Sequence, residues 1–160
     1  MLATRLGLPT AATAQIPSPF DYENQALLFL PRGMPDPTSS DYLPAVVDVA
    51  MPLIEASGGG AFFLFTSHRA LARAAELVRS RWDPFAGGGT QESLLLVQGE
   101  SPRERLLHDF REHGNALLLG TASFWEGVDV KGAALRLVII EKLPFASPDD
   151  DTAPTEVHLT

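Results

Sequence analysis

The sequence predicts an α/β fold in which a mostly parallel sheet is flanked by helices. Short, mostly apolar runs alternate along the chain with segments whose apolar residues recur at helical spacing. Few polar residues interrupt these runs, which is typical of parallel strands that are covered on both faces. The runs expected to form strands are 26–30, 61–65, 93–97, 116–119 and 135–140.

Three helices are expected between these strands. The first covers 41–57, although Pro52 should kink or end it because a proline in a helix interior removes a hydrogen bond. Ser67 is placed to cap the second helix, and the Ser-Pro-Arg-Glu run at 101–104 has the form of a capping box for the third. The inward faces of the first two helices are expected to carry Val46, Val47, Ala50, Leu53, Leu71, Ala74, Ala75 and Val78.

Composition limits the class of protein. The 160 residues carry a formal net charge of -8, which argues against strong independent binding of nucleic acid but allows local contacts beside a more basic partner. The absence of Cys excludes disulfides and thiolate ligands for a metal or an iron–sulfur cluster. No apolar run approaches the roughly 20 residues that cross a membrane, so a cytoplasmic location is expected by elimination.

Segments that follow the strands are the places to search for a site, because open parallel sheets bind ligands at the carboxyl ends of their strands. These segments are 66–69, 98–101, 120–129 and 141–145. The most informative is GTASFWEGVDVKG at 120–132, which combines glycines, hydroxyls, carboxylates and a large aromatic ring. The ring of Trp125 suits stacking on a base, whereas the simpler alternative is a tight loop whose Phe124 and Trp125 fill the core.

Three stretches of the chain resemble the DinG group of DNA helicases. They are SPFDYENQALLFLP at 18–31, FLFTSHRAL at 63–71, and LLLGTASFWEGVDVKGAALRLVIIEKLPFASPDD at 117–150. The group includes the YoaA-type proteins and is related to the XPD helicases. Its motor has two RecA-like lobes with the ATP site between them, and this sequence resembles the second lobe.

The resemblance implies a division of the chain. Residues 1–25 correspond to a connector from the first lobe, and 26–146 to the second lobe, with motif IV at 65–67 and motif V at 120–129. Residues 147–160 are expected to form an acidic, disordered tail.

Several elements of the complete motor have no counterpart in the sequence. There is no G-x-x-x-x-G-K-[S/T] phosphate-binding loop, because the glycine run at 87–90 lacks the Lys. There is no D-E-A-H-like run, and motif VI would follow Phe145, where the chain instead turns acidic. We therefore expect a fragment that does not hydrolyse ATP alone. ATP and Mg²⁺ would be held mainly by the missing first lobe, which together with single-stranded DNA is the expected partner.

The resemblance also implies roles for individual residues. The residues expected to bind DNA are Thr66, Ser67, His68, Arg69, Thr121, Ser123 and Trp125, and those expected on the nucleotide side are Glu126, Gly127 and Asp129. Each has a simpler interpretation: Ser67 as a helix cap only, His68 as a solvated residue, Arg69 paired with a carboxylate, and Asp129 holding a turn.

Two functions of different classes remain open from the sequence. One is a component of an ATP-dependent DNA helicase that moves on single-stranded DNA, with a role in DNA repair. The other is a non-catalytic RecA-like module that docks a partner protein, which the acidic charge and the missing phosphate-binding loop favour. A different α/β enzyme has no support, because no nucleophile–base pair or carboxylate pair stands at a convincing spacing.

Overall fold

The computed structural model describes residues 21–84, 92–121, 124, 130 and 134–143. The described residues divide between two units, with the boundary between Arg32 and Gly33. The first unit contains the short helix α2 (Tyr22–Gln25), followed by residues without regular structure.

The strand expected at 26–30 does not form. These residues have no strand pairing, and the apolar side chains of Leu27 and Leu28 are 94% and 81% exposed. An apolar run of this length indicates that the segment favours burial, but it does not indicate that the segment joins the sheet. The expectation of a buried strand here was wrong.

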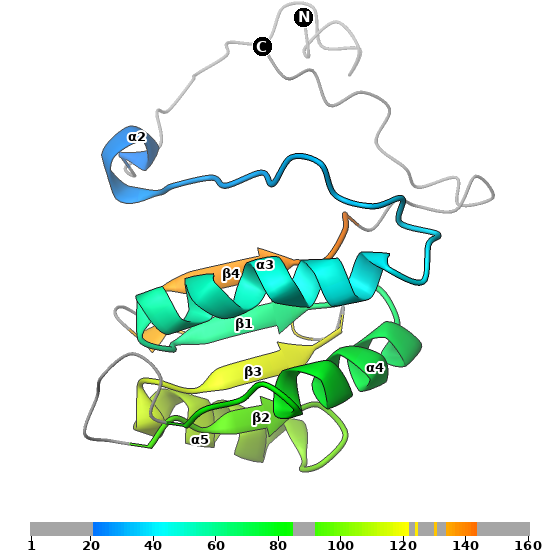
Figure 1. Ribbon diagram of the computed structural model, residues 1–160. Helices are drawn as coiled ribbons and strands as arrows, with labels where there is room; N and C mark the ends of the chain where they lie inside the picture. The colour runs from blue at the N-terminus through cyan, green and yellow to red at the C-terminus, as the bar shows by residue number, and fades with distance from the viewer. Residues whose placement is uncertain (1–20, 85–91, 122–123, 125–129, 131–133, 144–160) are drawn as a thin grey trace, which may run out of the picture. The chain divides into compact units, whose positions relative to one another are not determined.

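The second unit contains a sheet of four parallel strands in the order β2-β3-β1-β4 (Figure 1). The strands are β1 (Ala61–Leu64), β2 (Leu95–Val97), β3 (Leu117–Gly120) and β4 (Leu137–Ile140). In register, Ala61 of β1 lies opposite Leu117 of β3 on one side and Leu137 of β4 on the other. The parallel α/β class predicted from the apolar runs is confirmed, with β1 and β3 as the central strands.

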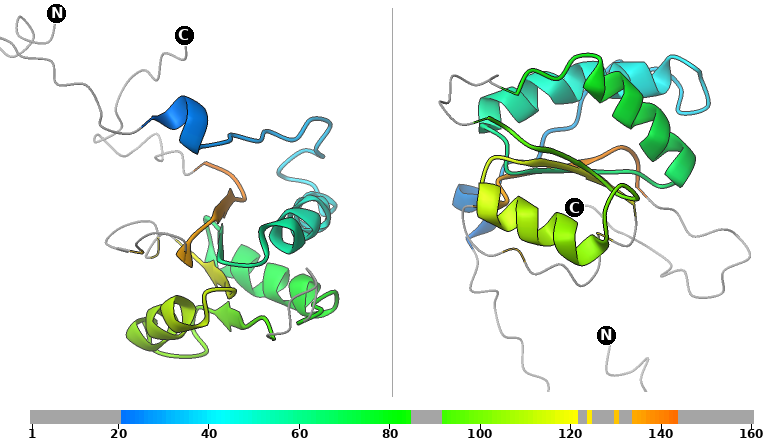
Figure 2. Two further views of the ribbon diagram at one scale, coloured as in Figure 1. Left: turned by 90° about the vertical axis from the view of Figure 1, so that its left-hand side faces the viewer. Right: turned by 90° about the horizontal axis from the view of Figure 1, so that it is seen from below.

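Helices cover the two faces of this sheet (Figure 2). Helices α3 (Tyr42–Ser57) and α4 (His68–Arg79) lie on one face, and α5 (Arg103–His113) lies on the other. The apolar residues predicted to face inward on α4, namely Leu71, Ala74, Ala75 and Val78, are all buried.

Helix α3 does not end at Pro52. It continues to Ser57, and the side chain of Pro52 is exposed while Val47, Ala50 and Ile54 are buried. Packing of this apolar face offsets the hydrogen bond that the proline removes. The helix ends instead at Gly58, whose φ of 66° is the left-handed conformation that glycine adopts without strain.

Helix α5 begins at Arg103, with Pro102 rather than Ser101 at its N-cap position. Pro102 offers no side-chain cap, and its backbone carbonyl accepts hydrogen bonds from the backbone N–H groups of Arg105 and Leu106. The helix ends at Gly114 in a left-handed conformation, as glycine at a helix terminus predicts.

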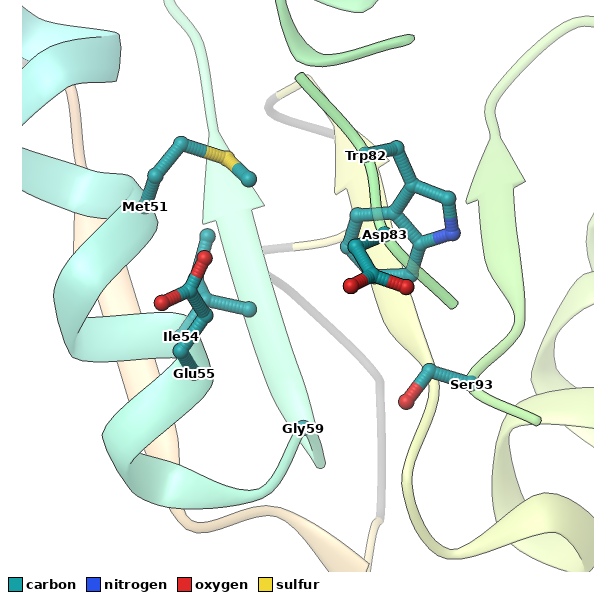
Figure 3. A pocket seen from close by; sticks show the side chains of 7 residues that line it. All are labelled: Met51, Ile54, Glu55, Gly59, Trp82, Asp83 and Ser93. Carbon is teal, nitrogen blue, oxygen red and sulfur yellow. The ribbon is translucent and has the colours of Figure 1, made fainter. Parts of the chain in front are cut away.

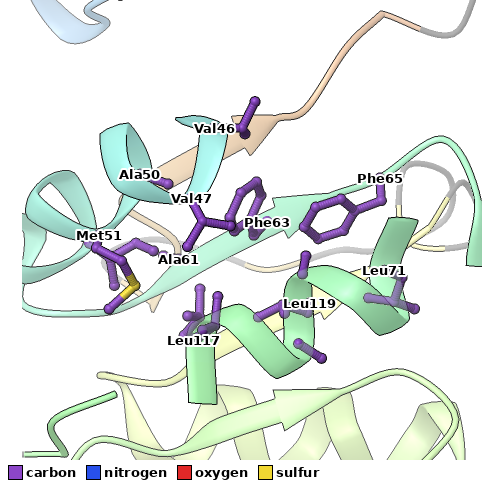
Figure 4. Packing of buried hydrophobic residues seen from close by; sticks show 14 of the residues in the cluster. Val46, Val47, Ala50, Met51, Ala61, Phe63, Phe65, Leu71, Leu117 and Leu119 are labelled. Atoms are coloured by element: carbon purple, nitrogen blue, oxygen red, sulfur yellow. The ribbon is translucent and has the colours of Figure 1, made fainter. Parts of the chain in front are cut away.

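The core consists of one apolar cluster on each face of the sheet. Residues of α3 and α4 pack against Phe63, Phe65 and Leu119 on one face, where the rings of Phe63 and Phe65 lie 4.5 Å apart between centroids (Figure 4). On the other face the ring of Phe110 on α5 lies 4.7 Å from that of Phe62. This packing fixes the sheet, and with it the positions of the loops at the carboxyl ends of the strands.

Candidate functional site

The four strands all end at the same edge of the sheet because they are parallel, and a polar residue follows each of them within two positions. Gln98 follows β2, Thr121 follows β3, Thr66 follows β1 and Glu141 follows β4. Four segments far apart in the sequence therefore bring polar groups together at the carboxyl edge, the usual ligand-binding edge of such sheets.

Gln98 and Thr121 form one side-chain contact between neighbouring strands. The Oε1 atom of Gln98 accepts hydrogen bonds from the backbone N–H of Thr121 at 2.6 Å and from its hydroxyl at 3.0 Å. The backbone N–H of Gln98 donates to the carbonyl of Leu119 at 3.0 Å, which holds Gln98 beside β3. Thr121 is 6% exposed, so this contact satisfies two buried donors.

Thr66 and Glu141 form a second contact, between β1 and β4. The hydroxyl of Thr66 donates to Oε2 of Glu141 at 3.3 Å, and the Glu141 side chain is only 3% exposed. The hydroxyl of Tyr42 on α3 donates to the backbone carbonyl of Glu141 at 2.7 Å. The ammonium group of Lys142 lies 3.8 Å from the other carboxylate oxygen of Glu141.

The environment of Tyr42 changes its ionisation. Burial raises the pKa of the Tyr42 hydroxyl above its ordinary value, and the nearby charge of Glu141 raises the same pKa further. The phenol therefore stays protonated, and remains a hydrogen-bond donor, to a higher pH than a free tyrosine would.

Backbone hydrogen bonds join the two contacts. The N–H of Phe65 donates to the carbonyl of Gly120 at 2.9 Å, and the N–H of Glu141 donates to the carbonyl of Leu64 at 2.9 Å. The edge is consequently a connected network, in which a shift of one strand end is opposed by its neighbours.

The first turn of α4 adds polar groups to this edge. The Oγ atom of Ser67 accepts a hydrogen bond from the backbone N–H of Ala70 at 3.1 Å, so the predicted cap is confirmed. His68 and Arg69 are exposed in the same turn. A helix amino terminus presents backbone N–H groups and a positive dipole end, which together favour an anion.

A groove runs beside this turn, between α4 and the segment that follows β2. Apolar and charged side chains both line it, and Arg79 and Glu100 form an ion pair there. The lining residues are His68, Leu71, Ala72, Ala75, Glu76, Arg79, Val97, Gln98, Gly99 and Glu100.

A second pocket lies at the opposite, amino-terminal edge of the sheet (Figure 3). Met51 and Ile54 of α3 face Trp82 across it, and Ser93 lines it just before β2. The side chains of Glu55 and Asp83 give this pocket an acidic rim. Within the described ranges no group of three or more His, Asp or Glu side chains is arranged to hold a metal ion.

Only part of the predicted site lies within the described residues. The structure brings Thr66, Ser67, His68 and Arg69 to the carboxyl edge together with Thr121. The predicted residues Ser123, Trp125, Glu126, Gly127 and Asp129 lie outside the described residues. Phe124 is 3% exposed and belongs to the core cluster beneath α5, as the simpler interpretation of this loop expects.

Sequence reasoning did not single out Gln98, Glu141 or Tyr42. The segments that begin with Gln98 and Glu141 were recognised as places to search, but no motif distinguished these two residues within them. The available signal was a polar residue directly after an apolar strand, SLLLV before Gln98 and LVII before Glu141. Their partners are 23 and 75 residues away along the chain, and this pairing is a product of the fold.

The comparison with known families gives the class of this parallel α/β domain. Residues 50–158 match the family model of the helicase C-terminal domain. The match covers more than half of the chain, which therefore belongs to this family.

The most similar relatives include bacterial helicases of one group. The chain is 44% identical to ATP-dependent DNA helicase YoaA of Escherichia coli and 39% identical to that of Haemophilus influenzae. It is 34% identical to ATP-dependent helicase DinG of Mycobacterium tuberculosis. These alignments cover 92%, 91% and 93% of this chain, but only 22%, 21% and 22% of the relatives. The predicted resemblance to the DinG and YoaA helicases is confirmed.

No solved structure matches the chain. Among the residues that the structure describes, no helix is both long enough and apolar enough to cross a membrane.

Proposed function

We propose that this chain supplies the second motor lobe of an ATP-dependent DNA helicase and contacts single-stranded DNA through the carboxyl edge of its sheet. The observation that carries the proposal is the joining of motif IV and motif V residues at one edge. Thr66 after β1 and Thr121 after β3 belong to the two sequence motifs of the resemblance, and the backbone bond from Phe65 to Gly120 connects their strands.

The first turn of α4 is the proposed phosphate contact. Ser67 caps the helix, and the exposed side chains of His68 and Arg69 stand beside its backbone N–H groups. Phosphate oxygens are recognised by such N–H groups, hydroxyls and guanidinium groups, and the contacts carry no sequence specificity. The acidic chain, with a net charge of -8, would make only a few of them and would bind weakly.

Hydrolysis of ATP is assigned to groups outside this sequence. Phosphoryl transfer needs a phosphate-binding loop and a Mg²⁺ site, and the sequence contains no G-x-x-x-x-G-K-[S/T] run. In this proposal a first lobe holds ATP and Mg²⁺, the predicted residues Glu126, Gly127 and Asp129 approach the nucleotide, and the chain alone is inactive.

The proposed phosphate contact is tested with two arginine variants of equal charge. Arg69→Ala should weaken binding of an oligothymidine at low salt about fivefold, the loss of about 1 kcal/mol for one solvent-exposed ion pair. Arg73→Ala is the matched control, because Arg73 lies one turn further along α4 and pairs with Glu76 at 2.8 Å. Fluorescence anisotropy with a labelled oligonucleotide measures both.

Equal effects of the two substitutions would mean that only net charge matters, and would remove the first turn of α4 from the interface. Failure of the wild-type chain to bind at low salt would favour the alternative, a non-catalytic module that docks a partner protein.

A further inference from the structure

The segment that follows β2 makes two separate contacts with the segment that follows β3. Gln98 accepts both hydrogen bonds of Thr121 through one oxygen, at 2.6 and 3.0 Å. Five residues after Gln98, the guanidinium carbon of Arg103 lies 5.5 Å from the centre of the Phe124 ring. Thr121 and Phe124 thus both contact residues that lie between the end of β2 and the start of α5.

The Gln98 contact fixes the backbone N–H and the hydroxyl of Thr121, the first residue after β3. The backbone N–H of Thr121 donates to a side chain rather than to a carbonyl of a neighbouring strand, so its direction is set by Gln98. The side chain of Phe124 lies so close to Gly120 that an added Cβ there would stand 2.8 Å from the ring. The Phe124 ring therefore packs closely against the end of β3.

The contact with Thr121 requires a hydrogen-bond acceptor at position 98. An apolar side chain of the same length would leave the N–H and the hydroxyl of Thr121 without an acceptor in a site that is 6% exposed. The backbone N–H and the hydroxyl of Thr121 both donate to Gln98. The contribution of Thr121 to an interface therefore depends on where Gln98 holds it.

We propose that Gln98 is a positioning residue, which holds Thr121 at the end of β3 and thereby tunes the contact of Thr121 with single-stranded DNA. This inference rests on the proposed function. Gln98 itself is not assigned a contact with DNA or nucleotide; it acts through Thr121.

Two substitutions of Gln98 separate the acceptor from the rest of the side chain. Gln98→Met keeps the length and removes the oxygen, whereas Gln98→Glu keeps an acceptor oxygen in the same place. Hydrogen exchange of the Thr121 amide reports on positioning, with the Leu117 amide of β3, which donates to the carbonyl of Leu94 at 2.8 Å, as the internal reference. Oligothymidine binding at low salt reports on function.

In Gln98→Met, exchange at Thr121 should accelerate about tenfold while exchange at Leu117 stays unchanged. Oligothymidine affinity should fall about fivefold in the same variant. Gln98→Glu should retain the protection of the Thr121 amide. If Gln98→Met does not fold, Gln98→Asn takes its place: the shorter side chain withdraws the acceptor oxygen from Thr121, and the same changes in exchange and binding are expected.

The other possible results would contradict either the positioning role of Gln98 or the proposed function on which it rests. Unchanged exchange at Thr121 would overturn the positioning role, and so would faster exchange with unaltered oligothymidine affinity. Equal acceleration at Thr121 and Leu117 would show that Gln98 only stabilises the fold. Absence of binding by the wild-type chain would instead remove the proposed function, and the exchange data would then decide by themselves whether Gln98 holds Thr121.

Discussion

At the scale of single residues, two helix-to-strand turns depend on glycine: Gly59 lies between α3 and β1, and Gly114 lies between α5 and β3. Gly59 has a φ of 78°, and a Cβ added there would stand 2.0 Å from the backbone oxygen of Asn115. Gly114 has a φ of 67°, but an added Cβ would meet no atom within 4 Å. Both positions carry the strain of the left-handed conformation, and only Gly59 adds a collision with backbone.

We expect Gly59→Ala to lower the free energy of unfolding by about 3 kcal/mol or more, since backbone strain and steric overlap add. Gly114→Ala should cost only about 1 kcal/mol, the strain alone. Urea denaturation of the two variants measures the difference. Equal losses would mean that the close approach of Gly59 to Asn115 does not contribute.

The hydrogen bond from Tyr42 to Glu141 predicts a pH dependence. Because the pKa of Tyr42 is raised in the folded state, the folded protein keeps the phenol proton at a pH where the unfolded chain loses it. The associated stability is fully present below the ordinary tyrosine pKa of about 10, and it is lost as the pH rises through the folded-state pKa.

Tyr42→Phe should cost about 1 kcal/mol at neutral pH through the lost hydrogen bond. The difference between wild type and variant should shrink above about pH 10, because only the wild type carries this titration. Urea denaturation at both pH values measures it. A difference that stays constant with pH would contradict the linkage.

At the scale of elements, the sequence predicted the parallel sheet and its helices well wherever an apolar run had a partner within the chain. The run at 26–30 misled because its composition equals that of a buried strand, yet Leu27 is 94% exposed. In β4 the pattern predicted cover on both faces, but Val138 and Ile140 are 49% and 41% exposed, because α5 packs against β1, β2 and β3 instead. The hydrophobic pattern of a segment indicates that its side chains favour burial. Tertiary packing decides which of those side chains are buried.

The same reasoning applies to the candidate site. The positions of Thr66 and Thr121 at strand ends followed from the order of runs and from the parallel class. Their partners, Glu141 and Gln98, did not follow, because a strand order of β2-β3-β1-β4 makes neighbours of segments that are not consecutive.

The packing of α5 is expected to depend on one aromatic residue. Phe110 is fully buried, and its ring contacts that of Phe62 beneath the helix. Phe110→Ala should lower the free energy of unfolding by about 4 kcal/mol, from lost burial and the cavity that remains. Leu27→Ala, at a site that is 94% exposed, should change it by less than about 0.5 kcal/mol.

Thermal and urea denaturation of both variants tests this comparison. A large decrease in the free energy of unfolding of Leu27→Ala would mean that the run at 26–30 is buried, contrary to the structure.

At the scale of the whole molecule, the chain spans about a fifth of the length of its helicase relatives, with 22% of the Escherichia coli protein covered. The carboxyl edge of the sheet supplies hydroxyls, a capped helix terminus and an exposed arginine, but no phosphate-binding loop occurs in the sequence. We therefore propose that this lobe contacts DNA and that hydrolysis requires both lobes together.

The most direct test of this assignment is one titration of the wild-type chain with oligothymidine at several salt concentrations, with Mg²⁺ and ATP present and phosphate release recorded. Weak binding is predicted, with a slope of log affinity against log salt between about -0.7 and -2, which corresponds to one to three phosphate contacts. No phosphate release is predicted. Absence of binding at the lowest salt would contradict the proposed DNA contact, and sustained phosphate release would contradict the need for the first lobe.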